Sequence, residues 1–126
     1  MLSFPPTVRV FVCQVPVDMR RSFNGLAGSV EEHFQADPLN GHLYVFFNRR
    51  STIVKVLVWD RTGFVIYSKR LEQGRFQYHQ YASKEPLDFA RLLLILEGID
   101  LRDSRQRRRF YLTKKKHKRV YNSGVN

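Results

Sequence analysis

The spacing of apolar residues changes several times along the first hundred positions, and each change predicts an element. Residues 8–14 are rich in valine and alternate roughly in polarity, which is typical of a strand. Pro16 and Asp18 end this segment, and Asp18 is expected to cap the N-terminus of a helix. Apolar residues then recur every three or four positions and form one stripe, which predicts packing against a sheet: Met19, Phe23, Leu26, Val30 and Phe34.

Further strand-like segments follow in quick succession after a turn-rich connection at 37–41. The pattern predicts them at 42–48, 53–59 and 64–71, with a short additional strand at 75–81. The loops at 49–52 and 60–63 are short enough for β-hairpins, so these strands are expected to form an antiparallel meander.

A second helix is expected to begin near Pro86 and to end at Gly98, because proline is favoured in a first turn and glycine after a last one. It carries too many apolar residues for a surface helix, which predicts that these are largely buried: Leu87, Ala90, Leu93, Leu94 and Leu96. The order β-α-β-β-β-(β)-α predicts an α+β fold, an antiparallel meander of four or five strands with one or two helices packed on one face.

Length and composition fit one globular domain. The 126 residues, of which 43% are hydrophobic, are enough for a packed core. No apolar run approaches the ~18 residues that span a bilayer, and the first residues lack the features of a secretory signal, so no membrane association is expected. Cys13 is the only cysteine, so no internal disulfide is expected, and a reducing, cytoplasmic location is predicted.

The positive charge is concentrated at one end of the chain. The whole sequence has a formal net charge of +11, of which residues 1–101 carry only +2. Residues 102–126 contain ten lysines and arginines against one acid, a net charge of +9. This predicts a single α+β domain over 1–101 and a flexible basic tail over 102–126. A polycationic segment of this kind favours a polyanionic partner, so nucleic acid is the leading expected partner, with a solubilising tail as the alternative.

Basic residues of the domain add to this picture. Arg20 and Arg21 are expected in the first turn of the first helix, where free N–H groups and two guanidinium groups suit a phosphate, although acidic partners within the protein explain them equally well. Arg49 and Arg50 are expected at a hairpin tip, exposed to solvent. Four more basic residues are expected on or beside the sheet: Lys55, Lys69, Arg70 and Arg75.

Tyrosines interleave with these basic residues, and together they suggest a surface that contacts a phosphate backbone or stacks on bases. The tyrosines are Tyr44, Tyr67, Tyr78 and Tyr81. The tail supplies the strongest signal, with nine basic residues expected to contact phosphates: Arg105, Arg107, Arg108, Arg109, Lys114, Lys115, Lys116, Lys118 and Arg119. Phosphate contacts of this kind give affinity without direct base recognition.

No pattern typical of an active site occurs in the sequence. Zinc-binding, phosphate-loop and serine-nucleophile motifs are absent, and the acids Asp18, Asp37, Asp60, Asp88 and Asp100 fall mainly at expected caps or turns. Cys13 lies in an apolar strand, where a buried structural cysteine is far commoner than a nucleophile. We therefore expect no catalytic residue, no metal and no cofactor.

Several sequence blocks resemble one protein family in order and spacing. These blocks are Asp18-Met19-Arg20-Arg21-Ser22-Phe23-Asn24-Gly25-Leu26, Asp37-Pro38, the run from Gly41 to Arg50, the run from Lys55 to Asp60 with Gly63-Phe64, and the run from Tyr67 to Phe76. Over about residues 8–100 the chain resembles the small second-reading-frame proteins (TnpB) of bacterial insertion sequences of the IS66 type. The resemblance implies a transposition accessory protein, encoded beside the transposase and without assigned catalytic residues. Val58 stands where the family commonly has a tryptophan, and the basic tail lies outside its pattern.

These observations leave three functional hypotheses. The first is a DNA-binding accessory factor that contacts double-stranded element ends or target DNA, the transposase of the same element, or both. The second is a protein-interaction subunit whose edge strand, or an exposed aromatic patch such as Phe46 and Trp59, recruits the transposase. The third is an RNA-binding module, because a basic tail does not separate RNA from DNA. Assembly into a homo-oligomer is left open.

Overall fold

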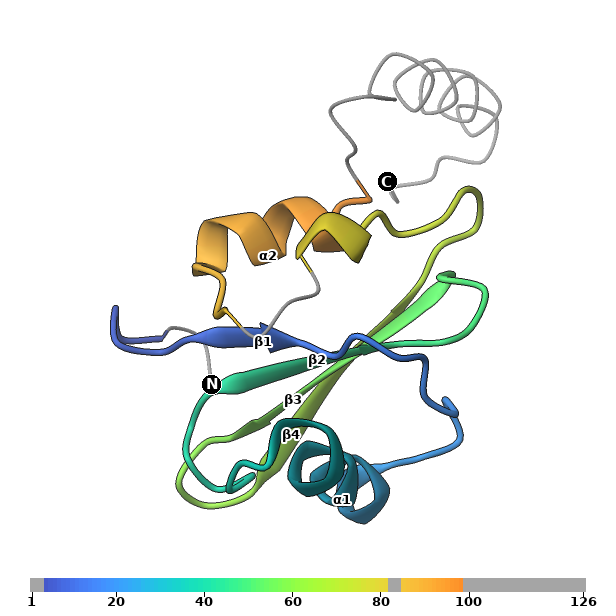
Figure 1. The fold of residues 1–126 in the computed structure, drawn as a ribbon. Helices are drawn as coiled ribbons and strands as arrows, with labels where there is room; N and C mark the ends of the chain where they lie inside the picture. Colours follow the sequence, from blue (N-terminus) through green and yellow to red (C-terminus); the bar gives the residue numbers. More distant parts are fainter. Residues whose placement is uncertain (1–3, 82–84, 99–126) are drawn as a thin grey trace, which may run out of the picture.

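The computed structural model describes residues 4–81 and 85–98, which form a four-stranded sheet with one α-helix on each face (Figure 1). The elements in chain order are β1 (Val10–Val12), α1 (Phe23–Phe34), β2 (Leu43–Phe47), β3 (Ile53–Trp59), β4 (Phe64–Arg70), the short 3₁₀ helix η1 (His79–Tyr81) and α2 (Phe89–Leu96). The α+β class is therefore confirmed. None of the helices in this described part is long and apolar enough to cross a membrane.

The sheet is mixed rather than wholly antiparallel. Its strand order is β1-β2-β3-β4, and the hairpins β2–β3 and β3–β4 confirm the predicted meander. β1, however, pairs with β2 in parallel, with Val10 opposite Leu43 and Val12 opposite Val45. The reason is the connection: α1 lies between β1 and β2 in the chain and carries it back along the sheet, so β2 begins at the same end as β1.

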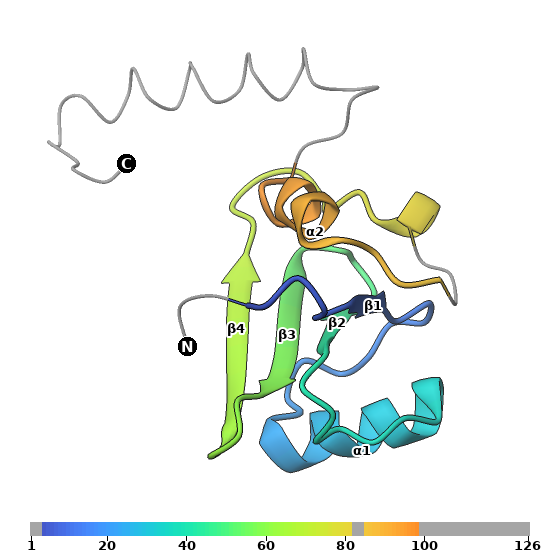
Figure 2. The same ribbon diagram turned by 90° about the vertical axis from the view of Figure 1, so that its left-hand side faces the viewer.

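The prediction that the helices pack on one face is wrong, because α1 and α2 cover opposite faces (Figures 1 and 2). Under α1 the core contains Leu26 and Val30 together with Phe46 and Leu57 from the sheet. Under α2 it contains a second set from all of β1, β2 and β3: Val10, Val12, Leu43, Val45, Phe47, Val54, Val56 and Val58. All five residues of β2 are consequently buried.

The first helix begins later than expected. Its N-cap is Ser22 and not Asp18, so Met19 lies before the helix. Asp18 forms a local turn instead, in which its Oδ1 accepts a hydrogen bond of 2.8 Å from the Arg20 backbone N–H. Aspartate commonly closes turns in this way, two residues ahead of the amide it binds.

The expected strand at 75–81 is an irregular segment that ends in η1. Two aromatic residues anchor it to the face of the sheet that carries α2. The Phe76 ring lies 5.5 Å from that of Phe47, and the Tyr78 ring stacks on Phe47 at 3.8 Å, both measured between ring centroids. Aromatic packing on the sheet face therefore takes the place of strand pairing at its edge.

The second helix has the expected end, with Gly98 in the left-handed conformation (φ 73°) and its N–H bonded to the Ile95 carbonyl. Its N-cap is Asp88, whose carboxylate accepts a 2.8 Å hydrogen bond from the Arg91 N–H. Burial differs from the prediction. Leu92, Ile95 and Leu96 are buried, whereas Leu93 and Leu94 are 46% and 38% exposed, because only one side of the helix contacts the sheet.

Candidate nucleic-acid interface

One end of the sheet gathers four arginines from two separate segments of the sequence. Arg49 and Arg50 form the tip of the β2–β3 hairpin, and Arg70 ends β4 beside it, paired across the ladder with Ile53. The segment after β4 folds back over the tip, because the Phe76 N–H bonds to the Ser51 carbonyl at 2.7 Å, so Arg75 joins the group. All four side chains are exposed. We call this group, Arg49, Arg50, Arg70 and Arg75, the arginine end.

The tip of the hairpin is held by a dense set of hydrogen bonds. The Asn48 side-chain oxygen accepts from the backbone N–H groups of Thr52 (2.8 Å) and Ile53 (3.0 Å), and its amide donates to the Thr52 hydroxyl (3.0 Å). Ser51, with φ 58°, donates its N–H to the Asn48 carbonyl. Arg49 and Arg50 therefore lie on a turn that is held by hydrogen bonds. Within the described part of the chain, their side chains make no hydrogen bond or ion pair. Arg70 contacts Glu72, Nε to Oε2 at 3.2 Å, on the surface.

Two of the predicted contact residues have structural partners instead. The Lys55 ammonium donates to the carbonyls of Met19 (2.8 Å) and Arg21 (2.9 Å), and so ties the loop before α1 to the sheet. The Lys69 ammonium donates to the Leu96 carbonyl at 2.7 Å, at the C-terminal end of α2, where a helix favours a cation. The donors of both lysines are thus directed at the protein's own main chain.

Arg20 and Arg21 do not place two guanidinium groups in the first turn of a helix as expected, since both residues precede α1. Arg20 binds both oxygens of Asp18, with the shortest contact 2.6 Å from a guanidinium nitrogen, which confirms an acidic partner within the protein. This hydrogen bond is the main cause that lowers the pKa of Asp18 to about 2. Arg21 donates to the hydroxyl of the buried Ser29 in α1.

The tyrosines do not form one stacking surface. Tyr44 and Tyr78 are buried, Tyr81 is half-buried, and only Tyr67 is largely exposed. Phe46, suggested as part of an exposed patch, is fully buried, and the half-buried Trp59 packs edge-on against Phe64. A strand that is covered on both faces buries aromatic residues on both sides, as β2 does with Tyr44 and Phe46.

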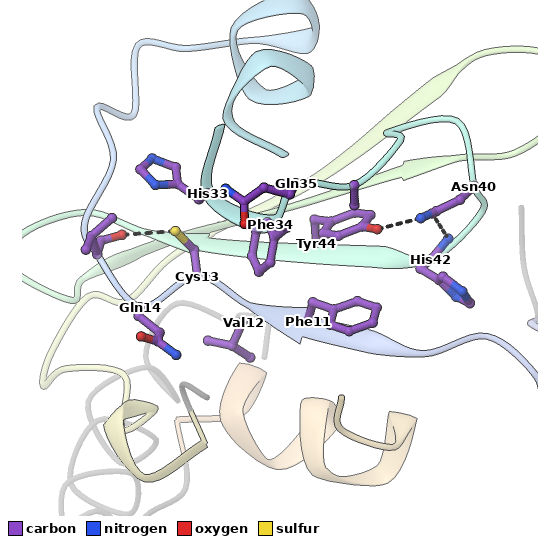
Figure 3. Close-up of a pocket in the computed structure, with 12 residues that line it drawn as sticks. Phe11, Val12, Cys13, Gln14, His33, Phe34, Gln35, Asn40, His42 and Tyr44 are labelled. Atoms are coloured by element: carbon purple, nitrogen blue, oxygen red, sulfur yellow. Dashed lines mark hydrogen bonds between the residues drawn. The ribbon is translucent and has the colours of Figure 1, made fainter. Parts of the chain in front are cut away.

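A pocket of about 420 Å³ lies between β1, the C-terminal end of α1 and the loop before β2 (Figure 3). Phe11 and Tyr44 line it with their rings stacked at 5.5 Å, and the Tyr44 hydroxyl accepts a hydrogen bond from Asn40 at 2.6 Å. Burial, with the nearby charge of Arg9 as a smaller cause, lowers the pKa of His42, which also lines the pocket. This aromatic lining contains none of the predicted phosphate contacts.

Cys13 also lines this pocket and is confirmed as a buried residue. Its thiol donates to the Val15 carbonyl at 3.3 Å, and burial is the main cause that raises its pKa above the usual value. A thiol held in the protonated form is a poor nucleophile. Among residues 4–81 and 85–98, no three His, Cys, Asp or Glu side chains are grouped so that they could hold a metal ion.

The acids predicted at caps and turns lie there wherever the structure describes them. Asp37 accepts from the Leu39 N–H in the loop before β2, and Asp60 accepts from Thr62 and Gly63 in the β3–β4 turn. These backbone hydrogen bonds, the one from Thr62 first, lower the pKa of Asp60. Asp100 and all nine predicted contacts of the tail lie outside the described residues. The four described aspartates, Asp18, Asp37, Asp60 and Asp88, therefore serve local structure.

Comparison with known proteins gives two kinds of match. The family model described as "IS66 Orf2 like protein" matches residues 8–106. An uncharacterized protein (y4hO) of Sinorhizobium fredii strain NGR234 is 36% identical over 103 residues, which cover 81% of this chain and 90% of that protein. A second uncharacterized protein (y4jC) of the same strain is 38% identical over 69 residues, 55% of this chain and 59% of that protein. No solved structure matches.

Proposed function

The chain belongs to the IS66 Orf2-like family of insertion-sequence proteins, and on that premise we propose that it is a non-catalytic transposition accessory protein that binds double-stranded DNA. The observation that carries the proposal is the arginine end, where folding gathers four exposed guanidinium groups. The DNA is that of the element ends or the target. Contacts come from these arginines and from the basic residues of the tail.

The arginine end suits a phosphate backbone for a physical reason. Guanidinium groups bind phosphate oxygens through two parallel hydrogen bonds, and Arg49 and Arg50 have no competing partner among the described residues. Their hydrogen-bonded turn is already ordered, so binding immobilises side chains but not the loop that carries them. Glu72 offsets part of the charge of Arg70, which makes the two residues at the tip the stronger contacts.

The described part of the chain ends at the same end of the sheet as the arginine end. Lys69, next to Arg70, binds the carbonyl of Leu96, and the described chain ends two residues later at Gly98. The described part of the chain therefore ends near the arginine end, and residues 102–126, with a net charge of +9, follow it in the sequence. We propose that the two act on one stretch of DNA, with Arg20 and Arg21 as peripheral contacts.

A fluorescence-anisotropy titration of the full chain tests the proposal. The probes are element-end DNA and an unrelated duplex of equal length, each measured at several salt concentrations. If six residues contact phosphates, the logarithm of the binding constant should fall with the logarithm of salt at a slope of about −5. Absence of binding at low salt would contradict the proposal. An RNA duplex that competes as well as DNA would favour the RNA-binding alternative instead.

The role of the tail is tested by two variants measured together. Deletion of residues 102–126 removes both the charge and the length of the tail, whereas replacement of its four lysines by glutamine keeps the length: Lys114, Lys115, Lys116 and Lys118. Both variants should bind more weakly and with a shallower salt slope, because each released contact removes about 0.9 from the slope. Unchanged binding by both would exclude the tail from the contact.

A second candidate function, recruitment of the transposase, is favoured by the outer side of α2. Leu93 and Leu94 lie there exposed, next to the exposed Phe89. Contiguous apolar surface of this kind is common where another protein binds. Co-purification of the full chain with the transposase, after nuclease treatment, tests this function. A Leu93→Gln/Leu94→Gln variant should lose the transposase while its DNA binding stays, and retention of the transposase would contradict the role of α2.

A further inference from the structure

The two edges of the sheet differ in how they are covered. At the β1 edge, Val10 and Leu87 exchange two backbone hydrogen bonds, of 3.2 Å and 2.7 Å. At the other edge, β4 is the outermost strand (Figure 2), and no described residue bonds to its outer side. β4 is seven residues long, as long as β3, and it is paired with β3 along its whole length.

The pairing with β3 determines which groups point outward. The Asp60 N–H bonds to the Gly63 carbonyl and the Leu71 N–H bonds to the Thr52 carbonyl. Hydrogen-bonded and non-hydrogen-bonded pairs alternate along an antiparallel ladder, so the odd-numbered residues of β4 bond to β3. The N–H and C=O groups that point outward belong to four residues: Phe64, Ile66, Ser68 and Arg70.

The side chains leave this edge unprotected along most of its length. Val65 and Tyr67 are 37% and 48% exposed on the face of the sheet that carries α2. Natural sheets usually block a free edge with charge, proline or a bulge. The charges of β4 are confined to its end, at Lys69 and Arg70, and the Lys69 ammonium is bound to α2.

We propose that β4 pairs with β4 of a second copy of this chain, antiparallel, with Tyr67 on the two-fold axis. The two sheets then form one sheet of eight strands. In this register Phe64 lies opposite Arg70 of the second copy, and Ile66 lies opposite Ser68. It is the one symmetric register that uses all four outward-pointing residues, and it supplies about eight main-chain hydrogen bonds.

The sequence of β4 is complementary to itself in this register. Lys69 faces Val65 of the second copy, and Arg70 faces Phe64, so no two like charges lie opposite each other. Tyr67 faces Tyr67, and directly opposed aromatic residues stabilise antiparallel pairs. The exposed apolar side chains of β4 are covered by the same pairing. This complementarity is the reason to prefer a second copy over an unrelated extended segment, and the inference does not depend on DNA binding.

Sedimentation velocity of the full chain, at high salt after nuclease treatment, tests the pairing. We expect a concentration-dependent dimer for the unchanged protein. Ser68→Pro should convert it to a monomer, because proline removes an outward N–H and leaves the bonds to β3 in place. Ser68→Ala, which keeps that N–H, is the matched control and should remain a dimer. Circular dichroism verifies that both variants are folded.

A charge exchange at the axis tests the register independently. Y67K and Y67D should each be monomeric, because each places two like charges opposite one another. A mixture of Y67K and Y67D should form the mixed dimer, which native mass spectrometry resolves from both homodimers by its mass. A folding defect in either variant would not lead to formation of the mixed dimer.

Three results would overturn the inference. The first is that the unchanged protein stays monomeric at every concentration when DNA is absent. A dimer that forms only on DNA, or a monomer that binds an extended segment of the transposase at β4, counts as this result. The second is a dimer that survives Ser68→Pro. The third is a folded pair of Tyr67 variants that fails to form the mixed dimer.

Discussion

The two arginines at the tip of the β2–β3 hairpin give the most direct test of the proposed DNA contact. We consider the double variant Arg49→Ser/Arg50→Ser in the full chain. Both side chains are exposed and have no partner among the described residues, so their loss should change the free energy of unfolding by less than about 0.5 kcal/mol. The turn itself is held by Asn48 and Ser51, which the variant retains.

The expected effect on DNA binding follows from counterion release. Each lost phosphate contact removes about 0.9 from the slope of log K against log salt, so the variant's slope should be shallower by about 1.8. When the salt concentration rises fourfold, the fold-loss of the variant's affinity should therefore be about 12 times smaller than that of the unchanged protein. At low salt, where these contacts are strongest, the variant should bind more weakly.

A matched control removes the same charge from the opposite end of the sheet. Arg9 precedes β1 and Arg61 lies in the β3–β4 turn, and both are exposed. Because Arg61 has a positive φ of 83°, asparagine is the suitable replacement there. The control Arg9→Ser/Arg61→Asn therefore has the same net charge as the test variant. Fluorescence anisotropy at several salt concentrations compares the two variants with the unchanged protein.

The two double variants separate a local contact from general electrostatic attraction. A shallower slope for Arg49→Ser/Arg50→Ser alone supports the arginine end as the contact. Equal changes in both variants would show that DNA responds only to total charge. An unchanged slope in the test variant would remove the hairpin tip from the interface and leave the tail to account for binding.

Other residues give predictions about stability. Lys55→Met should lower the free energy of unfolding in urea by about 2 kcal/mol, since it removes hydrogen bonds from a charged group to two carbonyls, while the salt slope of DNA binding stays unchanged. Asp88→Ala should cost about 1 kcal/mol in the same assay through loss of the N-cap of α2, and Asp88→Asn should restore most of it. Because the folded pKa of Asp18 is lowered to about 2, its contribution to stability is present above the ordinary pKa of the carboxyl and is lost as pH falls toward about 2. Arg20→Ala should bring that pKa back toward its usual range in an NMR titration, and an unchanged value would contradict the assigned cause.

The meander was predictable because it depends on short-range features. Strands of five to seven residues that are joined by loops of four or five residues usually pair as hairpins. The direction of β1 relative to β2 depends instead on the path of the connection through α1. The three residues of β1 do not indicate this direction. One signal for two covered faces was present: the uninterrupted apolar run Leu43–Phe47 is typical of a strand buried on both sides, and alternation alone does not account for it.

The candidate contact residues also divide into those whose environment is set by nearby sequence and those whose partners are distant in the sequence. Exposure of Arg49 and Arg50 followed from their position in a hairpin turn, which the sequence identified. The partners of Lys55 and Lys69 lie about thirty residues away along the chain and belong to elements on opposite faces. No local pattern distinguishes a lysine that binds a main-chain carbonyl from one that faces solvent, so only the tertiary structure separates them.

The arginine end and the free edge of β4 are compatible, since the proposed pairing uses the main chain of Arg70 and the proposed DNA contact uses its side chain. Arg70 ends β4, whereas the proposed two-fold axis passes through Tyr67, three residues earlier. In an antiparallel pair the two arginine ends lie at opposite ends of the joined strands, at least about 20 Å apart for seven residues of about 3.3 Å each. Pairing of β4 therefore leaves both hairpin tips exposed and separates them, so that a dimer would offer two phosphate contacts related by its own symmetry. Neither proposal requires the other, but a protein with both features would contact DNA at two places through one continuous sheet.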